Sequence, residues 1–319
     1  QFSLIPSRAT DYVDYISPNW RNSIGTDGSL KLVWDKTSSN YAQLTNMAHG
    51  MGLKVLPLIN GSGSTINTIL KSPAAREKLI QEIVTLINDT NTDGVVIDFE
   101  TPLDYGVKED PNDGVRNDLT AFMASLYAEL KPMNKVVIMT VMPRSSASQY
   151  WLDAFDYGAL SQVVDYMHVM TYDHHYRTSA PGPIAPYPWI KQVLTYIQSQ
   201  GVDMSKVLMG IPYYGRDWVV SGKDSSGNPT YDSTAYGYSK ALEIAENYGA
   251  TISYYKYNGN DPVGTPTFKY TDEKGVEHTV FFDDLVSWDA KLSIAREFGL
   301  AGVGAWSMGW VDETTAAEL

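Results

Sequence analysis

The chain has no cysteine among its 319 residues. This absence excludes disulfide bonds, cysteine-ligated zinc sites and thiol nucleophiles, and it leaves the redox compartment open. Basic residues are also few, with 24 Lys and Arg against 37 Asp and Glu, and the net charge is −13. So acidic a chain is a poor match for nucleic acid or for an anionic membrane surface. No apolar run reaches the length of a membrane span, and no signal peptide is visible.

Apolar and aromatic residues, by contrast, are plentiful. Hydrophobic residues make up 43% of the sequence, which is enough for a sizeable core in one large barrel or two domains. The 22 Tyr and 8 Trp exceed ordinary core needs. We expect some of these rings in the core and others on surfaces that face sugars.

Eight apolar segments predict strands, and helical patterns lie between most of them. Strands that alternate with helices form parallel βα units, so this pattern predicts a (β/α)8 TIM barrel. The alternative is a doubly wound open sheet, which usually has fewer strands, and no glycine-rich phosphate loop is visible. The expected strands are Phe2–Pro6, Tyr12–Ser17, Lys54–Ile59, Gly94–Phe99, Val136–Val141, Tyr166–Thr171, Val207–Ile211 and Gly302–Ser307. The expected helices are Tyr41–Met51, Ala74–Asn88, Asn117–Leu130, Tyr150–Leu160, Pro188–Gln200 and Asp284–Phe298.

The segment at residues 213–282 interrupts this alternation of strands and helices, because it is far longer than an ordinary βα loop. We expect it to form a small α+β insertion, with residues 1–212 and 283–319 forming the barrel. Loops that follow barrel strands lie on the catalytic face, so the insertion should wall one side of the cleft. Its expected elements are a helix at Ser239–Tyr248 and strands at Ile252–Tyr257, Thr267–Tyr270 and His278–Phe282.

Residues 93–100 read Asp-Gly-Val-Val-Ile-Asp-Phe-Glu, an apolar run that ends in two acids. Side chains alternate along a strand, so Asp98 and Glu100 point the same way, with Val96 below them. Two carboxylates at the end of a buried strand need partners, or one of them holds a proton at neutral pH. A protonated acid beside an ionised one is the arrangement that glycoside hydrolysis uses. The alternative is an acid pair solvated in a loop.

Polar and aromatic residues also follow the other expected strands. In a barrel the carboxyl ends of all the strands meet at one rim, so these residues should converge with Asp98 and Glu100. Acids, tyrosines and tryptophans at successive strand ends together indicate a site more strongly than any single pair. The candidates are Met142, Arg144, Tyr172, Asp173, Tyr213, Tyr214, Arg216, Trp218 and Trp306.

The pattern resembles family 18 of the glycoside hydrolases, which are chitinase-like barrels. Members carry Asp-Gly-x-Asp-x-Asp-x-Glu on strand four, Met-x-Tyr-Asp on strand six and a tryptophan on strand eight. Many also have an α+β insertion between strands seven and eight. A closer similarity is to the bacterial branch of spore-cortex and cell-wall lytic N-acetylglucosaminidases. The residues that carry it are Ile97–Glu100, Phe268, Tyr270, Thr271, Asp272, Gly275, His278, Val280, Asp283 and Asp284.

The resemblance implies a substrate-assisted, retaining mechanism. Glu100 would protonate the leaving oxygen and then activate water, while the substrate's own 2-acetamido oxygen acts as nucleophile. Asp98 would stabilise the acetamido N–H, and Tyr172 would bond the acetamido carbonyl. Asp173 would contact sugar hydroxyls, and Trp306 would form an apolar floor under the sugar. Glu100 then needs a raised pKa, which the Asp98 charge and burial could supply.

Val96 departs from the family pattern. The family usually has Asp at this position, and in this branch often Asn, which hydrogen-bonds the Asp two positions further on. Valine cannot do this, so Asp98 must find another partner or stay directed toward Glu100. The departure bears on the rate and the pH optimum, and it raises the weight of a weak hydrolase.

Some candidates have a structural alternative. Arg144 and Arg216 are candidates for contacts with substrate carboxylates, as on muramic acid, although surface arginines are common. Tyr213 and Trp218, like Tyr214, either stack on sugars or form the small core of the insertion.

Two further segments carry charged or metal-binding residue types. His174 and His175 are adjacent and do not share a face, so we expect no metal site there. The acidic stretch Asp104–Gly114 does not fit the EF-hand spacing, and we expect a loop that borders the cleft.

Two classes of function remain open at this point. The first is a hydrolase that cleaves β-1,4 bonds next to N-acetylglucosamine in peptidoglycan, spore cortex or chitin. The second is a non-catalytic or weakly active glycan-binding barrel, in which the strand-four glutamate is typically lost. Because Glu100 is present, we favour the enzyme. The resemblance to the spore and cell-wall branch favours peptidoglycan over chitin.

The expected partner is therefore a polysaccharide that contains N-acetylglucosamine, and we expect no nucleic acid, membrane, cofactor or metal. We expect a monomer that is secreted and associated with the cell wall or spore of a bacterium. The start Gln1–Ile5 reads like the middle of a strand. We therefore expect the natural protein to carry a leader or neighbouring domains.

Overall fold

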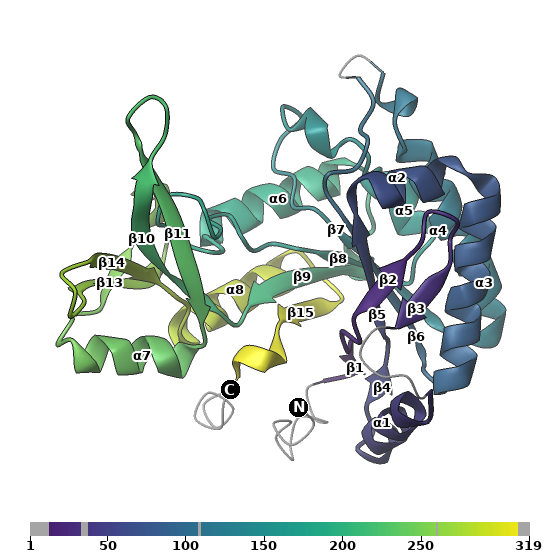
Figure 1. The fold of residues 1–319 in the computed structure, drawn as a ribbon, viewed down its shortest axis with the longest axis horizontal. Helices are drawn as coiled ribbons and strands as arrows, with labels where there is room; N and C mark the ends of the chain where they lie inside the picture. The colour runs from purple at the N-terminus through teal and green to yellow at the C-terminus, as the bar shows by residue number, and fades with distance from the viewer. Residues whose placement is uncertain (1–12, 33–37, 108–109, 260, 312–319) are drawn as a thin grey trace. The chain divides into compact units, whose positions relative to one another are not determined.

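The computed structural model describes residues 13–32, 38–107, 110–259 and 261–311 (Figure 1). Two compact units are present. The first unit comprises the described part of residues 7–169 together with Tyr196–Leu208, and the second comprises Met170–Thr195 and the described part of residues 209–319. The predicted strand at Phe2–Pro6 lies outside the described residues.

Four parallel strands organise the first unit. They are β5 (Leu58–Ser62), β6 (Gly94–Glu100), β7 (Val136–Val141) and β8 (Tyr166–Val169), and each pairs with the next in this order. Every residue of β6 is buried up to Phe99, and Glu100 is exposed. This burial explains why β6 is a nearly continuous apolar run, because both faces of a parallel sheet are covered.

Helices join these strands, as the alternating pattern predicts. α3 begins at Pro73, where the Ser72 side chain accepts a bond from the Ala75 N–H, and it ends before Asn91, which adopts the left-handed conformation with φ 54°. The helices of this unit are α1 (Ser38–Gly50), α2 (Gly63–Lys71), α3 (Pro73–Thr90), α4 (Arg116–Leu130) and α5 (Tyr157–Gln162). Its smaller strand pairs are β1 (Tyr15–Ile16) with β4 (Lys54–Val55), and β2 (Asn22–Ile24) with β3 (Leu30–Leu32). Its 3-10 turns are Pro111–Asp113, Lys131–Met133, Tyr150–Leu152 and Met204–Lys206.

The second unit has a five-stranded antiparallel sheet packed on one helix. Figure 1 shows α7 beside β13 and β14, and Ala241 and Ile244 of α7 pack against Phe268, Val280 and Phe282. In spatial order the strands are β11 (Pro229–Tyr236), β10 (Gly215–Lys223), β14 (Glu277–Phe281), β13 (Thr265–Thr271) and β12 (Ser253–Tyr255). The helix α7 spans Tyr238–Asn247. This is the predicted α+β insertion, and the boundaries at residues 213 and 282 stay a prediction.

The remaining strands and helices of the second unit flank this sheet in the sequence. Strand β9 (Val207–Pro212) pairs with β15 (Gly302–Trp306), and the chain passes between the units within β9 and within α6 (Tyr187–Ser199). Helix α8 spans Leu285–Glu297, and Asp284 caps it through a reciprocal pair of bonds with Ser287. The 3-10 turns of this unit are Tyr257–Gly259 and Met308–Trp310.

The motif at residues 268–284 has a structural explanation. Tyr270 and His278 are cross-strand partners in the β13–β14 hairpin, and both bond the buried carboxylate of Asp217. The Asp272 side chain accepts bonds from two turn N–H groups, and Gly275 supplies the φ of 78° that the turn needs. These residues therefore fix the hairpin of the second unit.

The prediction of one helix over Tyr150–Leu160 was wrong. The segment contains a 3-10 turn at Tyr150–Leu152 and then α5, which begins after Asp156. The Asp156 side chain accepts a bond of 3.1 Å from the Ala159 N–H, so a capping aspartate in mid-segment starts a new helix.

Candidate active site

Asp98 and Glu100 occupy the carboxyl end of β6 and lie on the same face of the strand. Val96 continues this face inward and packs with Leu56, Leu58 and Ile138 in one apolar cluster. Asp98 is only 7% exposed, whereas Glu100 is exposed. The strand thus passes from an apolar layer through a buried acid to an accessible acid.

A row of polar side chains crosses the four parallel strands at the level of Asp98. Asn60 of β5 is the register partner of Asp98, and Thr140 of β7 is the register partner of His168 on β8. The Thr140 hydroxyl donates a bond of 2.5 Å to Asp98 Oδ1 and so joins the two pairs. In the layer directly below this row, Val96 lies in register with Leu58 and Ile138, and Tyr166 takes the position on β8.

Thr140 supplies the hydrogen bond to Asp98 that a valine at position 96 cannot make. Both Thr140 and Asp98 are buried, so the bond forms away from bulk water. Burial raises the pKa of Asp98, and the bond from Thr140 opposes that rise. Asp98 therefore stays protonated to a higher pH than an ordinary aspartate. Sequence reasoning missed Thr140, although a single polar residue inside the apolar run Val136–Val141 was the available signal.

The loop after β7 uses its arginine internally. Arg144 is buried, donates to the carbonyl oxygens of Ser146 and Ala147, and forms an ion pair with Asp153. This favours the structural alternative for Arg144 over a contact with a substrate carboxylate. Met142 is the first residue after β7. Its carbonyl oxygen accepts a bond of 2.8 Å from the Tyr157 hydroxyl.

The second unit brings a different group of predicted residues together. Asp173 follows β8 in the left-handed conformation, with φ 55°. Its Oδ1 accepts a bond of 2.7 Å from the Tyr214 hydroxyl and lies 3.6 Å from Arg216 Nη2. Burial, and then the Asp173 charge, raise the pKa of Tyr214, so this hydroxyl stays a donor. Tyr172 packs against the apolar cluster that contains Tyr214.

The predicted aromatic residues of this unit differ in accessibility. Trp306 ends β15 and is 40% exposed, and its carbonyl oxygen accepts a bond of 2.8 Å from the Tyr213 N–H. Tyr213 is partly buried and packs edge-on against Trp288, with centroids 5.5 Å apart. Its burial raises the pKa of the Tyr213 hydroxyl.

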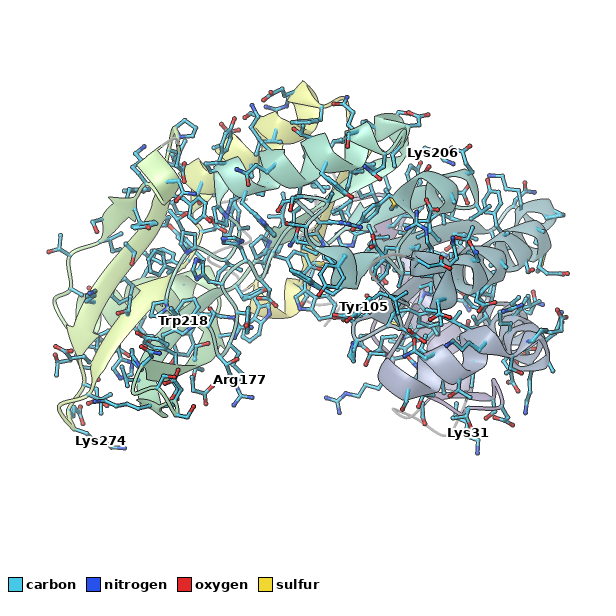
Figure 2. The ribbon with its side chains drawn as sticks, turned by 90° about the horizontal axis from the view of Figure 1, so that it is seen from above. Lys31, Tyr105, Arg177, Lys206, Trp218 and Lys274 are labelled. Carbon is cyan, nitrogen blue, oxygen red and sulfur yellow. The ribbon has the colours of Figure 1, made fainter. Side chains whose placement is uncertain are left out.

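Trp218 requires a correction to the proposed set. Its side chain is 1% exposed, packs against Phe281 and donates its indole N–H to the Tyr176 carbonyl oxygen at 3.2 Å (Figure 2). The indole N–H is thus already bonded, and the ring is packed inside the protein. This favours the core alternative, because a buried ring offers no face to a sugar.

The His174 and His175 rings pack edge-to-face, with centroids 5.0 Å apart, but their ring nitrogens have different partners. His174 Nε2 is 2.8 Å from the Tyr257 hydroxyl, and burial lowers the pKa of His174 to about 4. His175 Nδ1 is 3.0 Å from the Ala180 carbonyl oxygen, and burial also lowers its pKa. Both rings are therefore neutral near pH 7. Within the described ranges, no three His, Asp or Glu side chains are grouped as metal ligands.

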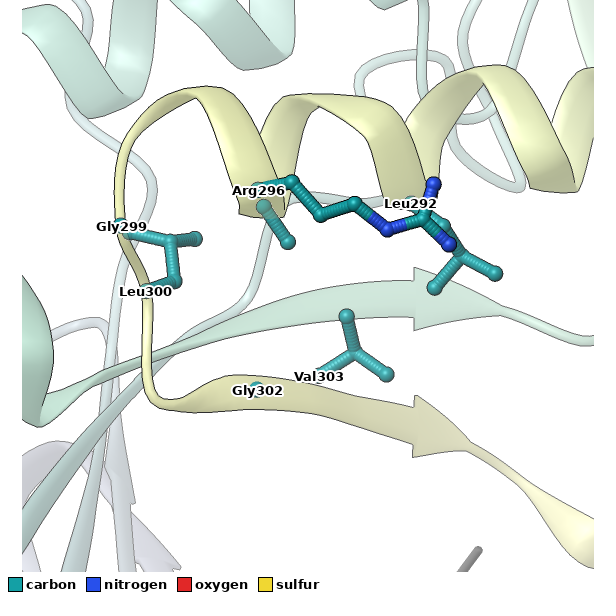
Figure 3. A pocket seen from close by; sticks show the side chains of 7 residues that line it. Leu292, Arg296, Gly299, Leu300, Gly302 and Val303 are labelled. Carbon is teal, nitrogen blue, oxygen red and sulfur yellow. The ribbon is translucent and has the colours of Figure 1, made fainter.

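The second unit also holds a cavity of about 470 Å³ beside α8 and β15 (Figure 3). It adjoins Gly302 and Val303 at the amino end of β15, whereas Trp306 is at the other end of that strand. Most of its lining is apolar, and Arg296 is the one titratable side chain among the lining residues. None of the predicted residues of this unit is among the residues that line the cavity.

The structure therefore forms two groups of predicted residues. Asp98, Glu100 and Met142 belong to the first unit, and Tyr172, Asp173, Tyr213, Arg216 and Trp306 belong to the second. Their convergence on one rim stays a prediction. No described helix is both long and apolar enough to cross a membrane.

Comparison with curated proteins finds relatives that are named as glycosylases and cortical fragment-lytic enzymes. The chain is 29% identical over 296 residues to the candidate sporulation-specific glycosylase YdhD of Bacillus subtilis. This match covers 92% of this chain and 64% of YdhD. It is also 28% identical over 288 residues to the cortical fragment-lytic enzyme of Bacillus anthracis. That match covers 89% of this chain and 62% of the other protein. The chain thus spans less than two thirds of the length of these relatives.

Comparison with solved structures and family models completes the assignment. The crystal structure of the C-terminal domain of a candidate chitinase from Desulfitobacterium hafniense DCB-2 is 81% identical, with a TM-score of 0.97. That match covers 99% of this chain and 91% of the other. It confirms the predicted α/β TIM-barrel fold. The model of glycosyl hydrolases family 18 matches residues 10–310. The chain belongs to family 18 of the glycosyl hydrolases.

Proposed function

We propose that the protein is a retaining glycoside hydrolase that cleaves β-1,4 bonds next to N-acetylglucosamine. The observation that carries this proposal is the acid pair of β6, in which a buried Asp98 with a raised pKa lies on the same face as the accessible Glu100. Two carboxyl groups two residues apart on one strand face are about 6.6 Å apart at their Cα atoms. Burial keeps Asp98 protonated to a higher pH than an ordinary aspartate, whereas Glu100 stays accessible to a substrate.

In the proposed reaction Glu100 donates its proton to the glycosidic oxygen as the bond from C1 to that oxygen breaks. The carbonyl oxygen of the substrate's 2-acetamido group attacks C1 and closes an oxazolinium ring, so no protein carboxylate bonds to the sugar. Glu100 then removes a proton from water, which attacks C1 and opens the ring. Two inversions at C1 give net retention.

The other residues support charge and position in this proposal. The Asp98 carboxylate accepts a hydrogen bond from the acetamido N–H as positive charge develops on that group. The Thr140 hydroxyl orients this carboxylate. Tyr172 bonds the acetamido oxygen, and Trp306 lies under the sugar ring at the cleavage position. Asp173, held by Tyr214 and Arg216, contacts sugar hydroxyls.

The proposed substrate is peptidoglycan, including spore cortex, with chitin as the second candidate. The cortical fragment-lytic enzyme of Bacillus anthracis and the glycosylase YdhD support the first choice, and Chitinase 63 of Streptomyces plicatus, 28% identical over 306 residues, supports the second. We further propose a monomer that is secreted and acts at the cell wall or spore. A weakly active glycan-binding protein is the other candidate, which the apolar Val96 below Asp98 favours.

The test compares the wild-type chain with Glu100→Gln on N-acetylglucosamine oligomers and on cortex fragments, with products identified by mass spectrometry. We expect turnover by the wild type and a loss of about 10²–10⁴-fold in the variant, with glycan binding retained. Binding without turnover in the wild type would support the glycan-binding alternative. Equal turnover by both proteins would contradict the role of Glu100.

A further inference from the structure

A long connection follows β8 and carries Asp173 near its start. Residues 170–186 contain neither helix nor strand, whereas a βα loop usually has about two to six residues. The backbone of Asp173 is in the left-handed conformation, with φ 55°. A residue other than glycine keeps this conformation only where the surrounding structure holds it. The contacts of the chain that follows Asp173 therefore bear on where its carboxylate lies.

His174, the residue after Asp173, ties the start of this connection to its end. Its backbone N–H donates a bond of 2.8 Å to the Ile184 carbonyl oxygen. Its Nε2 lies 2.8 Å from the Tyr257 hydroxyl, and its ring packs on the buried Trp189 with centroids 4.7 Å apart. One residue thus joins the connection to α6 and to the 3-10 turn that begins at Tyr257.

His175 packs inside the same connection. Its Nδ1 lies 3.0 Å from the Ala180 carbonyl oxygen, which can only accept, so Nδ1 carries the proton. Gly182 approaches the same ring so closely that a Cβ at this position would clash with it. Only glycine lets the chain pass there without displacing the ring. His175 and Gly182 therefore form one packed unit, which the His174 ring contacts edge-on at 5.0 Å.

The middle of the connection is held by different contacts, to β10 and β11. Trp218 of β10 donates its indole N–H to the Tyr176 carbonyl oxygen at 3.2 Å, and Arg177 pairs with Asp232 of β11 at 2.8 Å (Figure 2). The side chains of Arg177 and Asp232 are 67% and 45% exposed, so this ion pair contributes little to stability. It offers a control within the same connection that does not involve either histidine.

The two histidine rings act without charge near pH 7. Burial lowers the pKa of His174 to about 4, and burial also lowers the pKa of His175. A neutral ring that is hydrogen-bonded and packed contributes shape and a directed bond to its surroundings. These are the properties that fix a backbone conformation.

We propose that His174 and His175 are positioning residues, which hold the Asp173 carboxylate in the place where it meets the sugar hydroxyls of the substrate. This proposal rests on the proposed function, in which Asp173 contacts those hydroxyls. Tyr214 and Arg216 hold the carboxylate itself, but neither contact fixes the backbone that presents it. The histidines fix the backbone that follows. Loss of either ring should therefore displace the carboxylate and weaken its contact with the sugar.

The test is a double-mutant cycle of His175→Ala with Asp173→Ala, measured on the N-acetylglucosamine hexamer. His175→Ala alone should lower kcat/KM by about 10- to 100-fold, the scale of a misplacement by about 1 Å. Added to Asp173→Ala, it should cause a further loss of less than about twofold, because the carboxylate that it positions is then absent. His175→Asn keeps an N–H group near the place of Nδ1 and should recover most of the activity. Arg177→Gln is the control and should change kcat/KM by less than about twofold.

Hydrogen exchange gives a second readout that needs no glycan. His175→Ala and Tyr257→Phe should each speed exchange of the His174 amide, which bonds the Ile184 carbonyl oxygen, while the free energy of unfolding in urea changes little.

Three results would overturn the proposal. They are unchanged exchange of the His174 amide, an equal loss of kcat/KM in Arg177→Gln, and additive losses in the cycle, since the His175 ring would then support the fold independently of Asp173. If the wild type cleaves no glycan, the proposed function fails. The exchange result and the same cycle, measured as calorimetric binding of the hexamer, then decide the positioning role.

Discussion

The bond from Thr140 to Asp98 allows the sharpest test of how the acid pair is tuned. Thr140→Val keeps the branched shape of the side chain but removes the hydroxyl that donates 2.5 Å to Asp98 Oδ1. The lost bond favoured the ionised carboxylate, and burial already raises the pKa of Asp98. Its removal must therefore raise that pKa further. Less Asp98 is ionised at a given acidic pH, and the acid limb of kcat/KM moves to higher pH.

The size of the shift follows from the burial of both partners. Hydrogen bonds to charged groups contribute about 1.5–3 kcal/mol, and 1.36 kcal/mol corresponds to one pKa unit. We therefore expect the acid limb to move by about one to two pH units. Asp98 has a folded pKa above its unfolded value, so its ionisation destabilises the fold as pH rises through that interval. Thr140→Val should thus lower the free energy of unfolding more at neutral pH than in acid.

The assay is kcat/KM against pH on an N-acetylglucosamine oligomer, with urea unfolding at two pH values. Thr140→Ser is the matched control, because it keeps the hydroxyl and loses one methyl group. We expect its acid limb to stay within about half a pH unit of the wild type. An unmoved acid limb in Thr140→Val, or an equal shift in both variants, would refute the idea that this hydroxyl tunes Asp98.

Three further predictions concern other contacts. Tyr172→Phe should lower kcat by about 10- to 1,000-fold with little change in Tm, measured by kinetics and thermal unfolding, because one hydroxyl to the reacting group is lost. A fall in Tm alone would identify Tyr172 as a core residue. Val96→Asn, measured by pH profiles, should shift the acid limb to lower pH if the amide reaches Asp98, and a flat response would mean that Thr140 already suffices. Lys291→Met leaves Asp283 as an unpaired buried charge and should cost about 3–5 kcal/mol by urea unfolding, whereas adding Asp283→Leu should restore most of it. Equal stability of the single and double variants would contradict that account.

The parallel strands were predictable from the sequence because burial on both faces leaves a continuous apolar run. β6 and β7 match the expected ranges to within one residue. The β10–β11 hairpin was missed because only its base is buried. Its tip around Lys223 is exposed and polar, so neither an apolar run nor clear alternation reveals the strands.

The position of a site residue could be predicted where it belongs to a local sequence motif. It could not be predicted where contacts with residues elsewhere in the chain determine whether the side chain is buried or exposed. The alternation of β6 placed Asp98 and Glu100 on one face. The local sequence does not reveal that Asp153 forms an ion pair with Arg144, which lies nine residues earlier in the chain. The buried position of Trp218 also depends on packing with Phe281, a residue of a strand far along the chain.

The most direct test of the central claim compares two glycan oligomers that differ only in the acetyl group at the cleavage position. The substrate-assisted account predicts cleavage of the acetylated oligomer with retention at C1 and no detectable cleavage of the deacetylated one, because the nucleophile is missing. Mass spectrometry of the protein trapped with a fluoro-sugar should then show no glycosylated residue. Cleavage of the deacetylated oligomer, or a sugar attached to Asp98, would contradict the account and indicate a two-carboxylate mechanism.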